Sequence, residues 1–290
     1  MNSQGLFKRI TITLRKQPLK VFTYAFVVYA TIWTILEPLI GIVPNASRYF
    51  SGEIKFISLI LISVLIGAYR SAIPQEANLK YGNSNIKIVF GDLFSFDGIK
   101  VIPVSRFFHE TQVIPASLQG KLIQKFAQSG EGSKGFETYE KIIADSLHTE
   151  SFQEVFRDET QQNERFYPLG TTVLLSLDGQ PYILFSLTET ELKGYIPGDN
   201  CNALKMWIAL EAFWKKARIY ARGNPINIPL IGSGVTGIRL DSIHLLELNL
   251  LAIANSLEEG GKITTEEIRI ILHSKYLEDI DLSKFQDIWG

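Results

Sequence analysis

The sequence is poor in the residues that build disulfides and metal sites. Its 290 residues include one cysteine, Cys201, and four widely separated histidines, His109, His148, His244 and His273. A single cysteine forms no intramolecular disulfide, which fits a reducing compartment, and these residues match no zinc-ligand spacing. We therefore expect no metal site and no catalytic metal. The formal net charge is -1, so the chain also lacks the positive excess of a general nucleic-acid binder.

The N-terminal quarter lacks charge in two stretches. Val21–Leu36 and Phe56–Tyr69 contain no charged side chain. Each run is shorter than the about 20 apolar residues that span a bilayer. Lys20, Lys55 and Arg70 stand at the ends of these runs, where long basic side chains can reach the headgroups and lengthen the usable segment. The two runs together predict a transmembrane hairpin.

Positive residues predict the orientation of this hairpin. Five lysines and arginines lie within residues 8–20, whereas the connecting segment carries Arg48 and Lys55. This asymmetry places both termini in the cytoplasm, with the hairpin as two membrane spans. The alternative is a cleaved signal peptide and a core helix, although the second run is apolar on all sides. Glu37 fits either the headgroup layer or a polar contact between hairpins of an oligomer.

The rest of the chain alternates between strand and helix patterns. Residues 76–85 are rich in turn formers and predict a linker. Residues 86–290 predict an α/β fold, a three-layer α/β/α sandwich with a mixed sheet. Asp178-Gly179 predicts a hairpin turn, and Pro103 predicts that its strand is at an edge or ends there. The expected strands are 86–90, 101–104, 171–177, 182–187, 226–231 and 268–272, and the expected helices are 117–127, 137–147, 203–221 and 241–257.

A glycine loop follows one of the late strands. Its residues are Gly232, Ser233, Gly234, Val235, Thr236 and Gly237. The backbone N–H groups of such a loop can converge on an anion, usually a phosphate. A Walker A loop is excluded because no Lys-Ser/Thr pair follows the last glycine. The Rossmann spacing is matched, but three residues separate the last glycine from the predicted helix cap at Asp241, and little chain follows. Two interpretations of the loop therefore remain: a phosphate-binding site, and a plain loop whose glycines serve only its geometry.

An acid stands directly after the first strand of the soluble part. Asp92, followed by Leu93, comes after Ile86–Phe90 and Gly91. A carboxylate at this place can accept a hydrogen bond from an exocyclic amine such as adenine N6. Alone, such an aspartate is more often a turn residue. Combined with the glycine loop, it predicts a site for a nucleotide diphosphate.

These two motifs resemble those of the macro domain. Gly91-Asp92-Leu93 follows an early strand, and the run from Pro229 to Gly237 follows a late one. The resemblance covers residues 86 to the C-terminus. It implies that Asp92 holds adenine, with Leu93 beside it, and that Gly232–Gly237 wrap the diphosphate and the distal ribose. The implied ligand is an ADP-ribose-type nucleotide, with no separate cofactor.

One departure from that family concerns catalysis. Hydrolytic macro domains carry an asparagine-rich segment after the second strand, but residues 101–108 contain no asparagine. We therefore expect a binding protein without catalytic residues. A membrane-tethered ADP-ribosyl or nucleotide hydrolase is one alternative, and a non-catalytic membrane scaffold is another. Ser105 and Arg106 are expected to contact the ligand, although Arg106 fits a surface ion pair equally well.

Two N-terminal spans followed by a divergent macro domain resemble the effector of type II Thoeris, a bacterial anti-phage system. That resemblance implies a partner TIR-domain enzyme that consumes NAD and releases an ADP-ribose conjugate such as histidine-ADP-ribose. The effector is then expected to bind this nucleotide, to form a homo-oligomer and to disrupt the lipid bilayer.

Overall fold

The computed structural model describes residues 3–43, 52–108, 113–129, 133–157, 162–189, 201–234 and 238–289. The chain divides into two units. The first comprises residues 1–75 with 281–283, and the second comprises residues 76–280 with 284–290.

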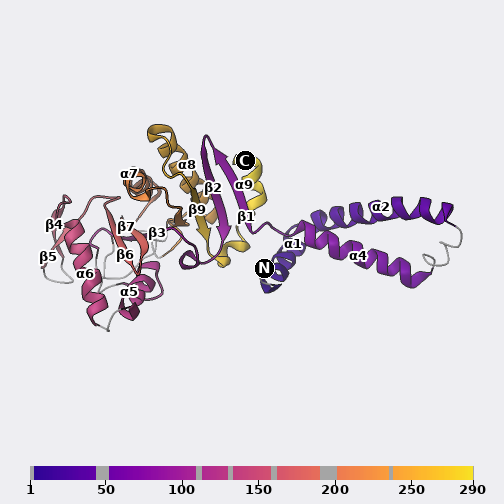
Figure 1. The fold of residues 1–290 in the computed structure, drawn as a ribbon, viewed down its shortest axis with the longest axis horizontal. Helices are drawn as coiled ribbons and strands as arrows, with labels where there is room; N and C mark the ends of the chain where they lie inside the picture. The colour runs from indigo at the N-terminus through magenta and orange to yellow at the C-terminus, as the bar shows by residue number, and fades with distance from the viewer. Residues whose placement is uncertain are drawn as a thin grey trace. The chain divides into compact units, whose positions relative to one another are not determined.

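Helices make up the described part of residues 1–75: α1 Ser3–Lys16, α2 Pro18–Ile42 and α4 Glu53–Ser71 (Figure 1). Both α2 and α4 are long and apolar enough to cross a membrane. With 25 and 19 residues, at about 1.5 Å per residue, they measure about 38 and 28 Å. The hydrocarbon core of a bilayer is about 30 Å thick. The helix is therefore longer than the uncharged run Val21–Leu36, because α2 continues past Glu37 and through Pro38.

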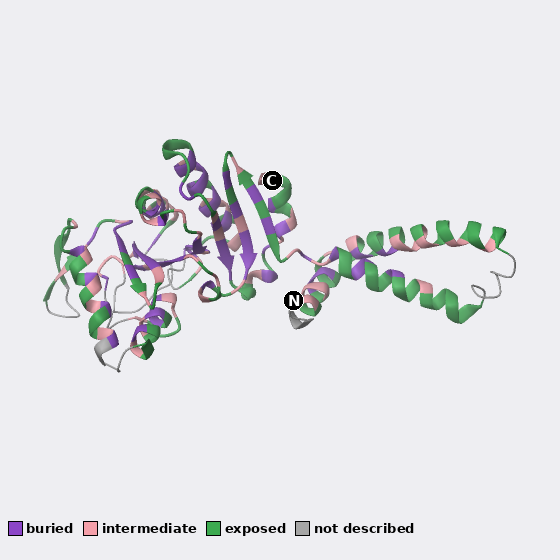
Figure 2. Ribbon diagram, in the orientation of Figure 1, coloured by how far each residue is buried: buried purple, intermediate pink, exposed green. Residues whose placement is uncertain are grey.

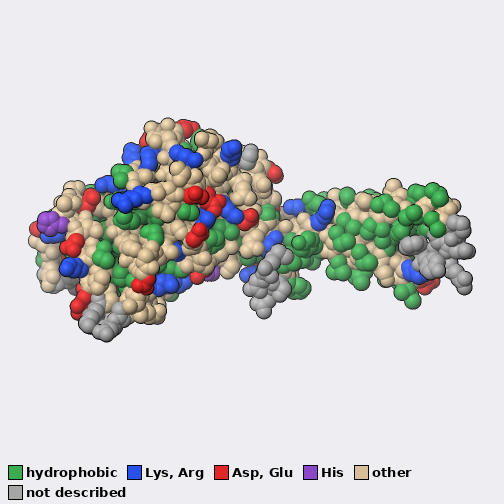
Figure 3. Space-filling model, in the orientation of Figure 1, with side chains coloured by type: hydrophobic (Ala, Val, Ile, Leu, Met, Phe, Trp, Pro, Cys, Tyr) green, Lys and Arg blue, Asp and Glu red, His purple; other side chains and the backbone are tan. Residues whose placement is uncertain are grey.

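The surface of this hairpin is apolar. Along both α2 and α4 most of the large hydrophobic side chains are exposed (Figures 2 and 3). The two helices touch at Gly67, where an added Cβ would lie 2.5 Å from the backbone nitrogen of Ala25. Small residues at such a crossing are typical of helix pairs in membranes. A water-soluble protein rarely exposes so continuous an apolar surface, so this one suits lipid.

The second unit is built on a mixed sheet of seven strands, in the order β1-β2-β9-β8-β3-β7-β6. Its strands are β1 Glu76–Tyr81, β2 Ser84–Phe90, β3 Ile99–Ser105, β6 Thr172–Leu177, β7 Gln180–Thr188, β8 Ile226–Pro229 and β9 Glu267–Leu272. The five inner strands are parallel, and the outer strands β1 and β6 are antiparallel to their neighbours. Asp178 and Gly179 both have positive φ, so the predicted hairpin turn between β6 and β7 is confirmed. A separate antiparallel ribbon pairs β4 Gln153–Arg157 with β5 Gln162–Phe166.

Helices cover both faces of the sheet. They are α5 Leu118–Ser129, α6 Ser133–Leu147, α7 Ala203–Ala221 and α8 Ser242–Gly260, with short helices η1 Leu93–Ser95, η2 Ser274–Leu277 and α9 Leu282–Trp289. On one face Leu122 and Phe126 of α5 and Tyr139 of α6 pack with Ile102 and Val104 of β3. On the other face α7 packs against β7, since the rings of Phe185 and Phe213 lie 4.8 Å apart, and α8 lies beside α7 (Figure 1). The predicted three-layer α/β/α sandwich with a mixed sheet is confirmed.

The predicted linker at residues 76–85 is wrong. This segment forms β1 and the start of β2. Gly82, with φ +54°, and Asn83 make the tight turn, whereas Asn78 and Asn85 lie within the strands. Ala77 and Leu79 alternate with exposed residues and face the core. Lys87 and Glu76 add an ion pair of 2.8 Å between the two strands. The many turn-forming residues in this segment favoured a linker, whereas the segment is part of a β-hairpin.

The placement of Pro103 is also different from the prediction. Its strand, β3, lies inside the sheet between β8 and β7. The ladder between β3 and β8 pairs Ile99 with Ile226 and Lys100 with Asn227, and goes no further. Pro103 in β3 and Pro229 in β8 have no backbone N–H to donate, which is consistent with this early end. The two strands therefore lose their pairing toward their carboxyl ends.

A lysine is buried in β3. Only 2% of the Lys100 residue is exposed, and its Nζ lies 5.7 Å from the centre of the Tyr182 ring. Burial lowers the pKa of this amine from 10.5 to about 8. The charged form is therefore less favourable in the folded chain than in the unfolded chain.

We expect Lys100→Met to raise the free energy of unfolding at pH 7 by about 1 to 3 kcal/mol. Between pH 8 and 10.5 the folded chain has lost this proton and the unfolded chain still holds it, so the stability of the native protein rises with pH. The advantage of the variant should shrink across that window. Urea denaturation of both proteins at pH 7, 9 and 10.5 measures it. A stability difference between the variant and the native protein that does not change with pH would contradict the lowered pKa of Lys100.

Candidate functional site

The predicted site residues gather at one edge of the sheet. The parallel strands β2, β9, β8 and β3 end at the same edge. Asp92 follows β2, the glycine loop follows β8, and Ser105 ends β3. Asp92 and the glycine loop are separated by β9, which corresponds to two strand spacings, or about 10 Å. This edge can therefore be spanned by an adenosine and its diphosphate.

Asp92 has a structural role that leaves its carboxylate accessible. Its Oδ1 accepts a hydrogen bond from the N–H of Phe94 at 3.2 Å and so caps η1. The side chain is exposed, and the described residues offer it no other partner. The turn role and a ligand role are compatible, because a carboxylate accepts several hydrogen bonds. Leu93, in contrast, is buried in the core beside α5 and α6, where it anchors the segment rather than facing a ligand.

The start of the glycine loop is held through carbonyl groups in the loop and just before it. Ser233 Oγ donates to the Leu230 carbonyl at 2.6 Å, and Asn249 Nδ2 donates to the Ile231 carbonyl at 3.2 Å. The Tyr276 hydroxyl, from η2, donates to the Ser233 carbonyl at 3.0 Å. Three successive anchors thus fix the peptide planes at the start of the loop.

In a trans peptide the N–H points opposite to the carbonyl. The anchored carbonyls of Ile231 and Ser233 therefore turn the N–H groups of Gly232 and Gly234 away from their anchors. Neither N–H finds an acceptor in the part of the chain that the structure describes. Two such N–H groups in one loop are suited to an anion. Val235, Thr236 and Gly237, which complete the predicted loop, lie outside the described residues.

The two glycines of this loop differ in their surroundings. Gly232 has φ +90°, and an added Cβ would meet Leu245 at 2.8 Å and both Ile238 and Met206 at 3.0 Å. Both the backbone and the packing therefore require glycine at this position. Gly234 is exposed, is not among the glycines with positive φ, and has no described atom within 4 Å of an added Cβ. The fold therefore does not require glycine at this position, and the open space beside Gly234 can be occupied by a ligand.

The glycine loop also stands where the chain direction across the sheet changes. After β3 the chain continues into α5 on one face, and after β8 it continues into α8 on the opposite face (Figure 1). In open α/β sheets, ligands bind outside the carboxyl ends of strands at such a switch point. The lost pairing between β3 and β8 lies at this same point. Topology and loop geometry thus indicate one binding place.

Ser105, the last residue of β3, and Arg106 directly after it have partners within the domain. Ser105 Oγ accepts a hydrogen bond from the Phe107 N–H at 3.3 Å and remains half-buried at the site edge. Arg106 pairs with Glu189 at 2.7 Å and donates from Nε to the Tyr167 carbonyl at 2.8 Å. Its guanidinium also lies 3.7 Å from the centre of the Phe166 ring. The structure therefore favours the ion-pair alternative for Arg106.

Sequence reasoning missed the residues after β9. His273 Nδ1 accepts from the Lys275 N–H at 3.2 Å, which leaves the proton of a neutral ring on Nε2. The Lys275 ammonium lies 4.7 Å from the ring of Tyr276, whose hydroxyl holds the glycine loop. A proton donor and a cation thus stand between Asp92 and the loop. The sequence pattern could have indicated them, because His273 directly follows the predicted strand 268–272 and Lys275 is two residues further on.

We expect Lys275→Glu to weaken the binding of a nucleotide diphosphate about 5- to 20-fold at low salt, through charge repulsion. The loss should shrink at 0.5 M salt, because these charges are exposed. Lys262→Glu is the matched control, since Lys262 is exposed and precedes β9 at the opposite edge of the sheet. Titration calorimetry compares them. Equal losses of nucleotide affinity in the two variants would mean that the net charge of the protein, and not the position of Lys275, determines the effect.

Little else at this edge is built for nucleophilic chemistry. Burial raises the pKa of the Cys201 thiol to about 11, so this cysteine is protonated at neutral pH. The described residues contain no group of three or more His, Cys, Asp or Glu side chains that could hold a metal ion. The site instead presents an acid, an imidazole, an ammonium and a glycine loop, which are groups that bind and orient a nucleotide.

An α/β/α sandwich with an acid after β2 and a glycine loop after β8 defines this unit as a macro-type domain. A family model described as "Thoeris protein ThsA, Macro domain" matches residues 86–273, and the chain belongs to this family. Among solved structures, "Oceanobacillus iheyensis macrodomain with MES bound" is similar, with a TM-score of 0.47 and 13% identity over 73% of this chain and 96% of that chain. No curated protein matches the sequence.

Proposed function

We propose that the chain is a membrane-anchored receptor and effector for an ADP-ribose-derived nucleotide in anti-phage defence. The observation that carries this proposal is the glycine loop. Carbonyl groups in it and just before it accept hydrogen bonds from Ser233, Asn249 and Tyr276. Asp92 stands two strands away at the same edge of a ThsA-type macro domain.

The geometry favours one orientation of the ligand. Adenine lies at Asp92, which accepts from its exocyclic amine, and the diphosphate lies on the glycine loop. His273 and Lys275, between these two groups, face the ribose and the phosphates. The distal ribose and its substituent then extend toward Ser105, at the end of the next strand beyond β8.

The hairpin of α2 and α4 anchors the receptor in the inner membrane as two spans. Lys20 lies in the first turn of α2, Arg70 in the last turn of α4, and Lys8, Arg15 and Lys16 in the preceding α1. Basic residues collected at the end where both helices meet the rest of the chain indicate the cytoplasmic side. Both termini then lie in the cytoplasm, where a soluble nucleotide is available.

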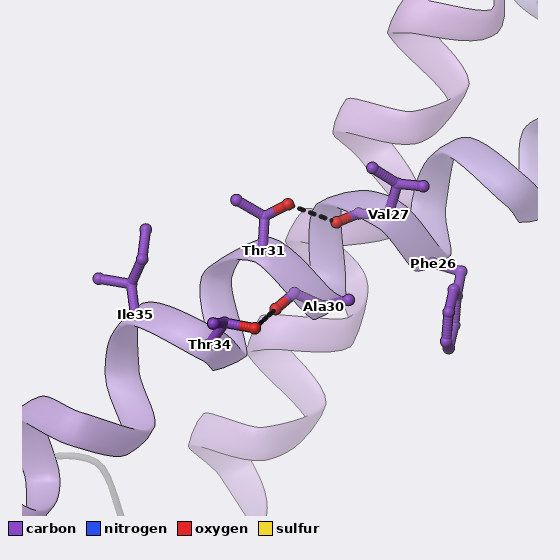
Figure 4. Close-up of a pocket in the computed structure, with 6 residues that line it drawn as sticks. All are labelled: Phe26, Val27, Ala30, Thr31, Thr34 and Ile35. Atoms are coloured by element: carbon purple, nitrogen blue, oxygen red, sulfur yellow. Dashed lines mark hydrogen bonds between the residues drawn. The ribbon is translucent and has the colours of Figure 1, made fainter.

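The hairpin also offers a surface for self-association. A shallow hollow of about 400 Å³ lies on α2, lined by Phe26, Val27, Ala30, Thr31, Thr34 and Ile35 (Figure 4). The hydroxyls of Thr31 and Thr34 donate to the carbonyls of Val27 and Ala30, one turn earlier. Because these hydroxyl groups already donate within the helix, Thr31 and Thr34 can lie with Ala30 against another helix in lipid. Ligand then drives oligomerisation only if it binds the assembled state more tightly.

We propose binding without turnover. Residues 101–108 lack the asparagine that hydrolytic macro domains carry there. The signal would come from a partner TIR-domain enzyme that consumes NAD and releases histidine-ADP-ribose or a related conjugate. The oligomer of this chain would then disrupt the bilayer.

The test uses the full chain in dye-loaded vesicles of phosphatidylethanolamine and phosphatidylglycerol. Addition of histidine-ADP-ribose should release dye, and NAD should not. Leakage that is equal with and without nucleotide would remove the gating by ligand. Chromatography of the added nucleotide separates receptor from enzyme, because turnover would support the hydrolase instead.

A further inference from the structure

Helix α1 has three chemically different sides. At about 100° per residue, one side carries Arg9, Ile12 and Thr13, a second carries Leu6, Phe7, Ile10 and Leu14, and a third carries Lys8 and Arg15. An amphipathic helix of a soluble protein normally has two sides, one packed and one polar. The exposed apolar side is the additional one.

The packed side fixes α1 to the end of the second apolar helix. Arg9 Nε donates to the Ile73 carbonyl at 2.6 Å, and the Ile73 N–H donates to Thr13 Oγ at 3.2 Å. Ile12 and Thr13 are buried. Because Ile73 lies two residues beyond α4, these bonds hold α1 at the level where α4 ends.

The apolar side is only partly covered by the described residues. Phe7 is 74% exposed and Leu14 is 47% exposed, one above the other at a spacing of seven residues. Leu6 and Ile10 beside them are half-buried. The neighbouring side presents the exposed cations Lys8 and Arg15. Apolar and basic groups therefore stand side by side along the same helix.

We propose that α1 lies flat in the headgroup layer of the membrane, with its apolar side in the lipid and its cations on anionic headgroups. This inference rests on the proposed membrane anchoring of α2 and α4. A helix of this composition binds a bilayer by burying its apolar side about 5–10 Å deep and by attraction to anionic lipids. Only Gln17 separates α1 from α2, so α1 begins at the membrane surface by covalent connection alone.

A lipid surface fits this side better than a second copy of the chain does. Four side chains form the apolar side, whereas a stable protein interface buries about 800 Å² on each partner. The adjacent cations would also repel those of a second copy, while anionic headgroups attract them. Because Ile73 is three residues before β1 in the chain, α1 also ties the membrane surface to the segment that leads into the macro domain.

Site-directed spin labelling of the full chain in vesicles tests this placement. In a Cys201→Ala background, which removes the one native thiol, nitroxides are attached at Phe7→Cys and at the matched neighbour Lys8→Cys. Vesicles contain phosphatidylethanolamine and phosphatidylglycerol. The ratio of collisions with oxygen, enriched in lipid, to collisions with a nickel chelate, confined to water, should be at least about threefold higher at position 7. Replacing phosphatidylglycerol by phosphatidylcholine should reduce this difference.

A label at Leu61→Cys, on the exposed surface of α4 and outside the hollow proposed for self-association, reports the hairpin separately. If this label is in lipid while positions 7 and 8 collide equally with nickel, α1 lies in water and the inference is wrong. Protection of position 7 from both reagents, with spin-spin broadening between copies, would assign the apolar side to a second copy and overturn it as well. A Leu61 label in water would overturn the membrane anchor itself.

Discussion

Replacing Asp92 with alanine is expected to weaken the binding of ADP-ribose-type nucleotides about 10- to 100-fold. A hydrogen bond to an ionised carboxylate contributes about 1.5–3 kcal/mol, and about 1.4 kcal/mol corresponds to a factor of ten. The Asp92 side chain is exposed and caps only the short helix η1, so the fold should survive. Titration calorimetry of the full chain in detergent measures the affinity, and thermal unfolding checks the fold.

The ligand itself provides the control for this variant. Ribose 5-phosphate lacks adenine, so Asp92→Ala should leave its weak binding unchanged. Asp92→Asn keeps one acceptor oxygen without the charge and should give an intermediate loss with ADP-ribose. If the loss were the same for nucleotides and for ribose 5-phosphate, Asp92 would not be the adenine contact.

The second large effect is a contrast between two glycines of the same loop. Gly234→Ala should leave thermal stability nearly unchanged, because the site of the new methyl group is open and exposed. It should weaken the binding of phosphate-containing ligands about tenfold or more, because the backbone must approach the diphosphate closely.

Gly232→Ala should act on the fold instead. Positive φ and contacts of 2.8–3.0 Å with Leu245, Ile238 and Met206 make the added methyl unfavourable by about 2–4 kcal/mol. Denaturation in urea and calorimetry on both variants separate the two effects. Full nucleotide affinity in a stable Gly234→Ala protein would show that the diphosphate does not lie on this loop.

The elements that sequence patterns predicted well are those with strong local signals. The helix at 203–221 matches α7 at both ends, and the turn at Asp178-Gly179 joins two strands as expected. Their periodicity and turn chemistry are local properties of the chain. Helix α9 and the ribbon of β4 and β5 had not been predicted, because they are short.

Other features depend on the order of the strands, which no local pattern encodes. Residues 76–81 form β1 and pair with β2, so a soluble fragment that begins at Ile86 would lose β1 and the first two residues of β2 and expose a sheet edge. Pro103 occupies an inner strand because β8 stops pairing before it. In both cases the structure of the segment depends on the strand that it pairs with, which the local sequence does not show.

The same distinction holds within the site. Asp92 and the glycine loop could be predicted because each directly follows a recognisable strand. The anchors Asn249 and Tyr276, and the neighbours of the loop after β9, could not, because they require β9 to lie between β2 and β8. The pairing of Arg106 with Glu189 likewise depends on β7 lying beside β3.

The most direct measurement is a calorimetric titration of the full chain with histidine-ADP-ribose, compared with the combined variant Asp92→Ala, Gly234→Ala. The predicted result is saturable binding at one site per chain, which is lost in the combined variant while its thermal unfolding stays cooperative. Absence of binding by both ADP-ribose and its conjugates to the folded native chain would contradict the receptor, as would equal affinity in the combined variant.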